Sequence, residues 1–193
     1  MSGPTASDVG RTSVYGTRFD AFVRYVLQRE TSRDKAGNVI TEHDPRDAGG
    51  ATRYGIDQRS HPHVNVDKLT EAEAIAIYFA GDWTATKAEQ LPEPIGELVT
   101  DIHIVGGHGT TWLQQCLNAG GMDLKTDGYM GPFTLAAAKA CDVQRVTSCI
   151  LGKRDLYYEA LARNIPSDHP FLGGWLNRDK VFVVWAKRNA GLA

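Results

Sequence analysis

The sequence predicts a mainly α-helical protein with at most one small β-hairpin. Its 193 residues contain several stretches in which apolar residues recur every three or four positions, the spacing that puts them on one face of a helix. Glycine pairs and prolines separate these stretches. Only residues 51–58 show a pattern compatible with a strand or hairpin arm. A hydrophobic content of 42% is enough for a globular core.

The elements follow one another with short connections. Residues 70–73 form a capping box, in which a threonine hydroxyl and a glutamate carboxylate satisfy free backbone donors at a helix start. We expect helices at Phe19 to Glu30, from residue 70 to about Ala80, from Ile95 to Val105, around Trp112 to Leu117, from Phe133 to Ala140, from Val143 to Arg163 with Val146, Ile150 and Tyr157 inward, and at the end around Trp175 to Trp185.

Composition limits the classes of function. The net charge of −2 and the lack of a basic cluster argue against binding to nucleic acid. No apolar run reaches the length of a transmembrane helix. Residues 1–18 lack the order of a signal peptide and are expected to be a flexible segment. The three cysteines show no metal-type spacing, so we expect reduced thiols in a protein made in the cytosol, with Cys116 and Cys149 packed as small apolar residues.

The first helix ends on an unusual residue. Phe19, Phe22, Val23, Val26 and Leu27 form its apolar stripe, and the next position of that stripe is Glu30. Burial and the partial negative charge of a helix carboxy-terminus both favour the protonated acid, which is the form that a general acid needs. The ordinary alternative is a solvated glutamate in the last turn of a surface helix.

A loop rich in aspartate and glycine follows this helix. Residues 43–56 read HDPRDAGGATRYGI, with two aspartates before Gly49 and Gly50. Glycines let the backbone adopt positive φ or approach another group closely. A helix that ends in glutamate, followed by such a loop, is typical of one wall of a cleft.

Glu30 and this loop resemble glycoside hydrolase family 108, the phage-type N-acetylmuramidases of the lysozyme-like superfamily. The family pattern D-P-x-D-x-G-G-x-T-x-Y-G-I is matched by residues 44–56, whereas Thr31 and Ser32 replace the Gly-Gly pair that usually follows the glutamate. Residues 100–114 resemble its F-D-x-x-V-N-x-G segment, with Asp101 and Gly107 kept and Thr100 and Val105 replacing Phe and Asn.

The carboxy-terminal part resembles the peptidoglycan-binding-like part of the same family. Residues 127–135 match D-G-x-x-G-P-x-T-L and residues 174–178 match G-W-x-x-R. The resemblance implies a lysozyme-like helical fold, with a catalytic part over residues 19–118 and a helical peptidoglycan-binding-like part over residues 119–193. We expect the second part to pack on the first.

The resemblance also implies roles for individual residues. Glycoside hydrolysis needs a proton donor and a group that stabilises or intercepts the sugar cation. Glu30 is the expected donor, Asp47 is preferred over Asp44 for the second role, and Thr52 is expected to hold a water molecule. The expected substrate-binding residues are Asp44, Tyr54, Trp83, Asp101 and Trp175. The aromatic residues could equally belong to the core, Thr52 could be an ordinary strand threonine, and Asp44 could cap a turn.

A zinc amidase is the competing enzyme that would also cut peptidoglycan. His43, His61 and His63, with Asp44, are possible ligands, but they lack the paired helical spacing of zinc hydrolases. We therefore expect no metal and no cofactor.

The sequence thus predicts an endolysin-like muramidase that hydrolyses the β-1,4 bond between N-acetylmuramic acid and N-acetylglucosamine. A lytic transglycosylase, and a non-catalytic wall-binding or secretion-accessory protein, are the alternatives. The expected partner is bacterial peptidoglycan, with no nucleic acid and no membrane insertion. We expect a monomer that reaches the cell wall from the cytosol through a holin or another export route.

Overall fold

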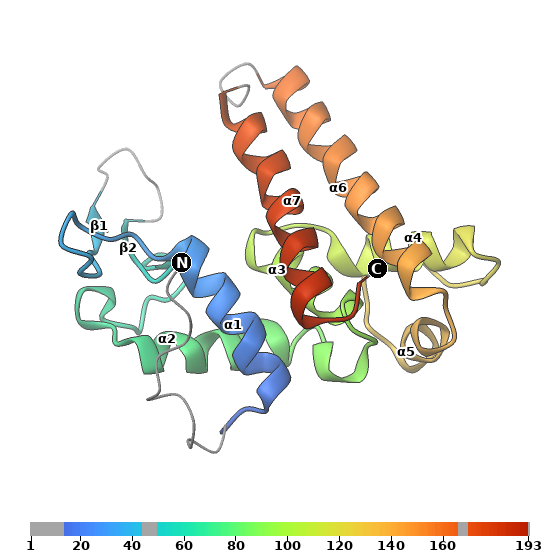
Figure 1. The fold of residues 1–193 in the computed structure, drawn as a ribbon, viewed down its shortest axis with the longest axis horizontal. Coiled ribbons are helices and arrows are strands. Elements are labelled where there is room, and N and C mark those ends of the chain that lie inside the picture. Colours follow the sequence, from blue (N-terminus) through green and yellow to red (C-terminus); the bar gives the residue numbers. More distant parts are fainter. Residues whose placement is uncertain (1–13, 44–49, 166–169, 193) are drawn as a thin grey trace. The chain divides into compact units, whose positions relative to one another are not determined.

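The chain is mainly α-helical, as the sequence predicts. The computed structural model describes residues 14–43, 50–165 and 170–192, which contain seven α-helices and a small antiparallel sheet (Figure 1). The helices are α1 (Thr17–Glu30), α2 (Glu71–Tyr78), α3 (Ile95–Ile104), α4 (Gly109–Ala119), α5 (Pro132–Lys139), α6 (Val143–Asn164) and α7 (Leu172–Asn189). Three shorter helical segments are η1 (Val66–Lys68), the π-helical η2 (Phe79–Trp83) and η3 (Ala88–Gln90).

The chain forms two compact units, one up to residue 75 and one from residue 76 onward. The boundary lies within α2, which continues directly into η2. The boundary after residue 75 is defined by contacts between residues. The boundary after residue 118 was inferred from sequence motifs and remains a prediction.

The first unit contains α1 and the sheet. All five residues of the predicted apolar stripe of α1 are buried, together with Tyr25, which the stripe did not include. The sheet has the order β1-β2-β3, formed by Glu42–His43, Ala51–Arg53 and Ile56–Asp57. Residues 51–58, which were expected to form a short strand or one hairpin arm, contain both arms of a hairpin, β2 and β3. Strand β1 was not predicted, because two residues are too short for a recognisable alternation.

The capping box that opens α2 is also confirmed. The Glu73 carboxylate accepts hydrogen bonds from the Thr70 backbone nitrogen at 2.8 Å and from its hydroxyl at 2.7 Å. The Thr70 hydroxyl in turn accepts a hydrogen bond from the backbone nitrogen of Glu73. Two free donors at the helix start are satisfied in this reciprocal way.

The second unit is built on α3. Four of the five predicted stripe residues of α3 (Ile95, Leu98, Val99 and Ile102) are buried, and the helix packs against α4 and α6. Val105 was expected in the same stripe, but it follows the last helical residue and is exposed. Gly109 opens α4 so close to α3 that an added Cβ would lie 2.8 Å from the Val99 carbonyl oxygen. The absence of a side chain there permits the contact between the two helices.

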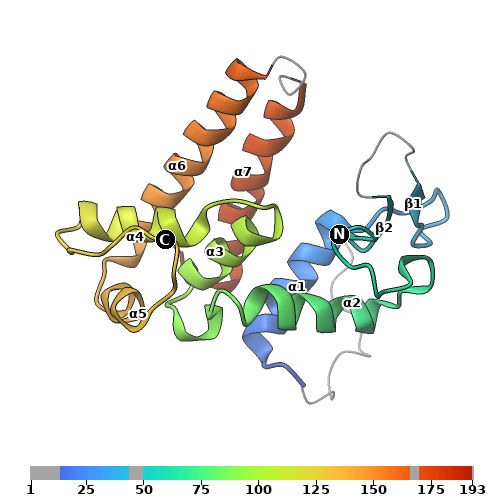
Figure 2. The same ribbon diagram turned by 180° about the vertical axis from the view of Figure 1, so that it is seen from behind.

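Helices α6 and α7 form a long pair within this unit (Figure 1 and Figure 2). Val146 and Ile150 of α6 are buried as expected, and Phe182 of α7 is buried as well. Tyr157, predicted to face inward, is half-buried and packs edge-to-face on Trp112 of α4, with 5.5 Å between the ring centroids. Its neighbour Tyr158 is more deeply buried, so the inner face of α6 includes both rings.

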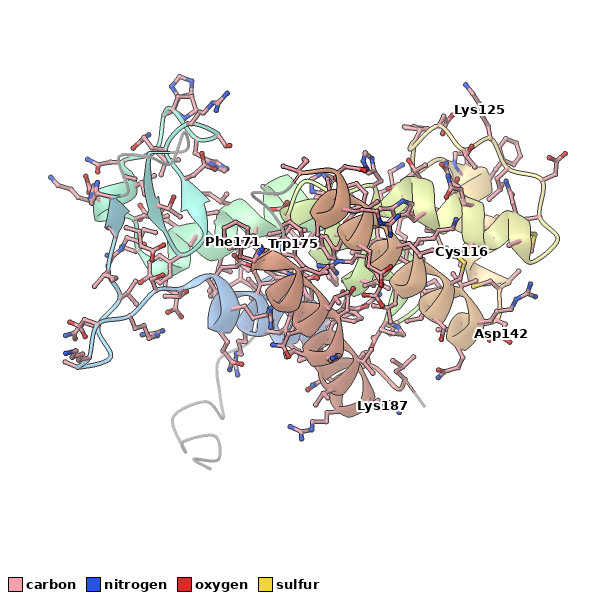
Figure 3. All side chains as sticks on the ribbon, turned by 90° about the horizontal axis from the view of Figure 1, so that it is seen from above. Cys116, Lys125, Asp142, Phe171, Trp175 and Lys187 are labelled. Atoms are coloured by element: carbon pink, nitrogen blue, oxygen red, sulfur yellow. A yellow bond between two sulfur atoms is a disulfide. The ribbon has the colours of Figure 1, made fainter. Side chains whose placement is uncertain are left out.

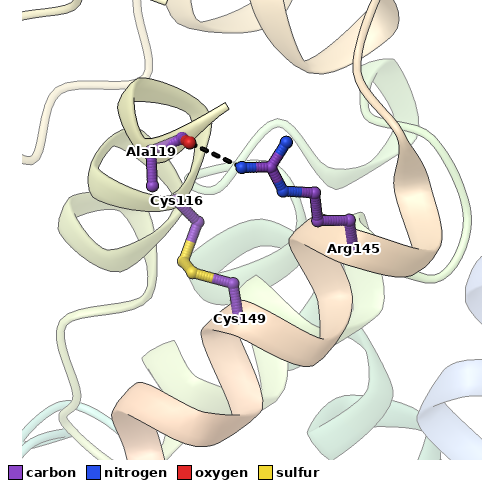
Figure 4. The surroundings of a disulfide bond; sticks show 4 residues. All are labelled: Cys116, Ala119, Arg145 and Cys149. Carbon is purple, nitrogen blue, oxygen red and sulfur yellow. Dashed lines mark hydrogen bonds between the residues drawn. A yellow bond between two sulfur atoms is a disulfide. The ribbon is translucent and has the colours of Figure 1, made fainter. Parts of the chain in front are cut away.

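The expectation of reduced cysteines is corrected by a disulfide. Cys116 of α4 and Cys149 of α6 are bonded, and the neighbouring Arg145 donates a hydrogen bond to the Ala119 carbonyl at 2.6 Å (Figure 4). The two cysteines lie 33 residues apart in different helices, so their spacing gave no signal. Cys141 is a free, half-buried thiol, and burial raises its pKa.

No helix in the described part of the chain combines the length and the apolar character required to span a bilayer.

Candidate active site

Glu30 is the last residue of α1 and is half-buried. The helix ends there because Thr31 adopts an extended conformation, while its backbone nitrogen still donates to the Leu27 carbonyl at 3.1 Å. The apolar stripe before Glu30 fixes the rotation of the helix, so the direction of this carboxyl group is set by a buried core.

The segment after Glu30 folds back in a tight loop. The Asp34 carboxylate accepts hydrogen bonds from the backbone nitrogens of Ala36 and Asn38 and from the side-chain amide of Asn38. The hydrogen bond from the Asn38 amide makes the largest contribution to lowering the pKa of Asp34. Arg33 and Val39 form a bridge across the loop, and the Ile40 nitrogen donates to the carbonyl of Ser32, one of the two residues that replace the Gly-Gly pair, at 3.0 Å.

Thr52 lies at the centre of the sheet. It pairs with Glu42 of β1 on one side and with Asp57 of β3 on the other, and it is half-buried. The tight turn after β2 consists of Tyr54 and Gly55, both with positive φ, at 55° and 78°. Such a two-residue turn matches the twist of a hairpin, but a tyrosine rarely adopts this conformation.

The environment of Tyr54 supports this strained turn. Its ring is buried, and the Arg53 guanidinium lies over it at 5.3 Å from the centroid. Arg53 also donates to the carbonyl of Leu69 at 3.0 Å and to that of Val39 at 3.2 Å. Sequence reasoning missed Arg53, and its place between Thr52 and Tyr54 in the motif was the signal that could have identified it.

The two candidate aspartates lie outside the described residues. Asp44 and Asp47 belong to the segment between β1 and β2, so their roles stay predictions. Gly50, which ends this segment, has φ of 77°, the positive value that the glycine pair was expected to allow.

The histidines make other contacts. His43 lies 2.9 Å from the Asp67 carboxylate, and the ring of His61 contacts the Asp57 carbonyl. A hydrogen bond with Asp82 raises the pKa of His103. Among the described residues, no three His, Cys, Asp or Glu side chains are grouped closely enough to hold a metal ion.

Asp101 and three side chains of the carboxy-terminal helices form a buried ion cluster. Arg178 binds both oxygens of Asp101, at 2.7 and 3.1 Å, and Arg154 donates to Asp101 Oδ2 at 2.8 Å. Arg154 also lies 3.0 Å from Asp179. Burial disfavours the Asp101 carboxylate, but the charges of Arg178 and Arg154 outweigh this effect and lower its pKa.

This cluster joins α3, α6 and α7. It also joins two separate motifs, since Asp101 belongs to the segment at residues 100–114 and Arg178 to the one at residues 174–178. Both motifs were identified in the sequence, but their pairing was not. The Asp101 side chain is fully buried, which favours a structural role; its expected contact with substrate stays a prediction.

The two candidate tryptophans differ in exposure. Trp83 is 2% exposed at the end of η2, where its backbone carbonyl accepts a hydrogen bond from Thr86. Trp175 is half-buried near the start of α7 and stacks on Tyr158 with 5.1 Å between ring centroids. Figure 3 shows Trp175 beside Phe171, which is 59% exposed. Trp175 therefore combines a fixed ring with partial access to solvent.

A buried glutamine organises the D-G-x-x-G-P loop at residues 127–132. The Gln114 amide nitrogen donates to the Asp127 carboxylate at 3.1 Å and to the Tyr129 carbonyl at 3.0 Å, while its oxygen accepts from the Gly128 nitrogen. Pro132 then opens α5 at a position where no backbone donor is needed. The turn residues of this motif thus stabilise the fold.

Two family models match the chain, one over the amino-terminal motifs and one over the carboxy-terminal motifs. Residues 24–107 match the model described as "Glycosyl hydrolase 108". This amino-terminal part of the chain is thus similar to glycosyl hydrolase family 108. Residues 108–180 match the model described as "Predicted Peptidoglycan domain". The family suggested by the sequence motifs is confirmed, and the protein is a glycoside hydrolase that degrades peptidoglycan.

A solved structure supports the fold. The chain is similar to the protein in "Structure of Brucella abortus SagA", with a TM-score of 0.70 and 22% sequence identity over 89% of this chain and 95% of that chain. Comparison with curated proteins gives no match.

Proposed function

We propose that this enzyme, whose amino-terminal part matches family 108, is a muramidase that hydrolyses the β-1,4 bond between N-acetylmuramic acid and N-acetylglucosamine. The observation that carries the proposal is the position of Glu30, a half-buried carboxyl at the end of a helix whose rotation is fixed by a buried apolar stripe. Glu30 lies within the segment matched by the hydrolase family.

In the proposed reaction, Glu30 donates a proton to the glycosidic oxygen as the bond to the muramic acid carbon breaks. Asp47 stabilises or intercepts the resulting sugar cation, and water completes the hydrolysis. Thr52, fixed at the centre of the sheet, is the proposed ligand for that water. Of the three aromatic residues expected to contact sugar rings, Tyr54 and Trp83 are buried, so Trp175, whose ring is partly accessible, is the proposed aromatic contact with the glycan.

The proposed site of action is the cell wall, after export from the cytosol by a holin or another route. The disulfide between Cys116 and Cys149 supports an oxidising final compartment, since disulfides persist outside the reducing cytosol. Phage lysis and bacterial wall remodelling both satisfy this requirement.

The products of peptidoglycan digestion test the proposal. Mass spectrometry of the soluble fragments is expected to show reducing N-acetylmuramic acid ends. Anhydro-muramic ends would instead indicate a lytic transglycosylase, and release of free peptides an amidase. Binding without any product would indicate a non-catalytic wall protein.

A further inference from the structure

Tyr129 and Phe133 are the most exposed aromatic residues in the described part of the chain, at 65% and 81%. Both lie in the short segment that runs from the D-G-x-x-G-P loop into the first turn of α5. Single exposed apolar residues are common on protein surfaces, but two aromatic rings in one short segment are a feature of binding surfaces. Neither ring takes part in the proposed cleavage step.

The motif of this segment separates residues that hold the turn from residues that are free to vary. Residues 127–135 match D-G-x-x-G-P-x-T-L, in which the Asp127 carboxylate accepts a hydrogen bond from the Tyr129 nitrogen at 3.0 Å. Tyr129 and Phe133 themselves occupy two of the three open positions. The turn therefore does not require aromatic side chains there, and the two rings are available for a contact that is specific to this chain.

Tyr129 is held firmly although its ring is exposed. Its backbone carbonyl accepts hydrogen bonds from the Gln114 side chain at 3.0 Å and from the Gly131 nitrogen at 2.9 Å. The ring lies against the backbone of Gly131, where an added Cβ would come within 3.1 Å of it. A ring that is fixed before binding loses little conformational entropy when a ligand covers it.

A cation from a distant part of the sequence lies beside this ring. Lys87 Nζ is 5.6 Å from the centroid of the Tyr129 ring and donates to the Met130 carbonyl at 2.9 Å. Lys87 has a φ of 53°, and among the described residues only Tyr54 shares a positive φ without being glycine. Such a backbone conformation is costly and is often found at functional sites. An ammonium group has three donors, so two remain for acceptor oxygens of a ligand.

The polar setting of the two rings favours a carbohydrate over a protein partner. The exposed residues directly before Tyr129 are lysine, threonine, aspartate and glycine, at residues 125–128. A sugar ring packs its C–H face on an aromatic ring and turns its hydroxyl and acetamido groups toward polar neighbours. A protein interface instead needs a closely packed apolar core. Two exposed rings and an ammonium group among polar residues therefore fit the sugar units of a glycan.

We propose that Tyr129 and Phe133 are stacking platforms for the glycan strand of peptidoglycan, with Lys87 as a donor to its acetamido oxygens. The choice of ligand rests on the proposed action on the cell wall. Both rings also lie within residues 108–180, which match a predicted peptidoglycan domain. The Cα atoms of residues 129 and 133 can lie at most about 14 Å apart, a distance that a few linked sugar units span.

This surface is a second contact in addition to the one proposed for Trp175. Lys125 lies at the start of the loop, with its ammonium group 3.6 Å from the Asp127 carboxylate. Figure 3 shows Lys125 and Trp175 at separate places on the second unit. Two contacts with one polymer raise retention on it more than either contact alone.

Retention on insoluble peptidoglycan is the first test, and it is measured with Glu30→Gln so that the wall stays intact. Tyr129→Ala and Phe133→Ala, added singly, are each expected to weaken binding roughly tenfold, because the apolar area that the sugar covers is lost. Tyr129→Phe keeps the ring and is expected to retain most of the binding. Leu156→Ala, at a leucine of α6 that is 66% exposed, is the matched control and is expected to bind like its parent. Equal retention of all these variants would overturn the proposed surface.

The second test identifies which part of the wall is bound. Glycan strands freed of their stem peptides by an amidase, and a soluble oligomer of N-acetylglucosamine, are titrated into the full chain and followed by NMR. Both probes are expected to shift the ring signals of Tyr129 and Phe133 in a saturable way. Binding of isolated stem peptides at these rings, or rings that respond to neither glycan probe, would overturn the choice of a glycan.

Digestion by the wild type is scored separately, by the new sugar ends released from the wall. A chain that releases no reducing ends but is retained through both rings would contradict the muramidase proposal alone. An active enzyme whose retention does not depend on the rings would contradict the proposed surface alone.

Discussion

Glu30 is a charged residue at a position where the apolar stripe of α1 predicts an apolar one. The sequence alone indicated that a carboxylate occupies the next position of an apolar stripe, and the structure places it at the end of α1 in a half-buried position. Tyr54 is a second residue of this kind, because its positive φ is rare for tyrosine and occurs inside a family motif. Neither feature is needed for a stable helix or sheet.

The two aspartates of the same motif lead to a direct comparison. In the sequence, Asp47 is closer to Gly49 and Gly50, whose backbone N–H groups are expected to stabilise an ionised carboxylate, whereas Asp44 precedes Pro45, which has no backbone N–H. Asp47→Asn is expected to slow digestion roughly 100-fold or more with little change in melting temperature. Asp44→Asn is expected to act mainly through stability. An inactive but fully stable Asp44→Asn would assign the second carboxylate to the other aspartate.

Substitution of Arg178 tests whether the buried ion cluster stabilises the fold. Arg178→Met leaves Asp101 with one guanidinium partner in a fully buried position, which is expected to cost roughly 3–5 kcal/mol of unfolding free energy. Chemical denaturation measures this change. Arg188→Met, at an exposed arginine of the same helix, is the matched control and is expected to change stability by less than about 0.5 kcal/mol. Equal effects of the two substitutions would show that the cluster does not hold the helices.

At the scale of elements, the sequence predicted what depends on local pattern. The apolar stripe of α1, four of the five stripe positions of α3 and the capping box of α2 were found, because each is determined by residues within a few positions of one another. The pairing of Asp101 with Arg178 and of Cys116 with Cys149 was not found. These pairs lie 77 and 33 residues apart, so they depend on how helices pack.

The disulfide between α4 and α6 is the covalent element of this packing. Closing a loop of this length restricts the unfolded chain, which stabilises the folded state by about 3–4 kcal/mol. The double variant Cys116→Ala with Cys149→Ala is therefore expected to have a free energy of unfolding lower by about 3–4 kcal/mol, measured by chemical denaturation. Reductant should lower the stability of the wild type and leave the double variant unchanged. Reductant sensitivity retained in the variant would assign the effect to another group.

At the scale of the whole molecule, Asp179 is expected to shape the dependence of stability on pH. Its pKa is raised to about 7 in the folded state, against about 4 for an aspartate in an unfolded chain. The folded state therefore holds a proton that the unfolded state has lost between these values. Its contribution is fully present below about pH 4 and is lost as the pH rises through 7.

The matching experiment is a series of denaturation curves from pH 5 to pH 8. The wild type is expected to lose stability across this range, and Asp179→Asn, which cannot ionise, is expected to show a flatter profile. His103, whose pKa is raised by Asp82, loses its own contribution as the pH rises through its folded pKa, so His103→Gln is examined in parallel. A slope unchanged by Asp179→Asn would assign the titration to another group.

The chain as a whole carries a hydrolase segment followed by a peptidoglycan segment, and the central claim is that Glu30 performs the chemistry of the first. The most direct measurement is the rate at which purified peptidoglycan releases reducing N-acetylmuramic acid ends, for the wild type, Glu30→Gln and the control Glu42→Gln at an exposed glutamate of β1. We expect Glu30→Gln to keep its melting temperature and to lose roughly 10²–10⁴-fold in rate, the usual contribution of a general acid. The control should match the wild type. A well-folded Glu30→Gln that keeps more than about a tenth of the wild-type rate would contradict the account.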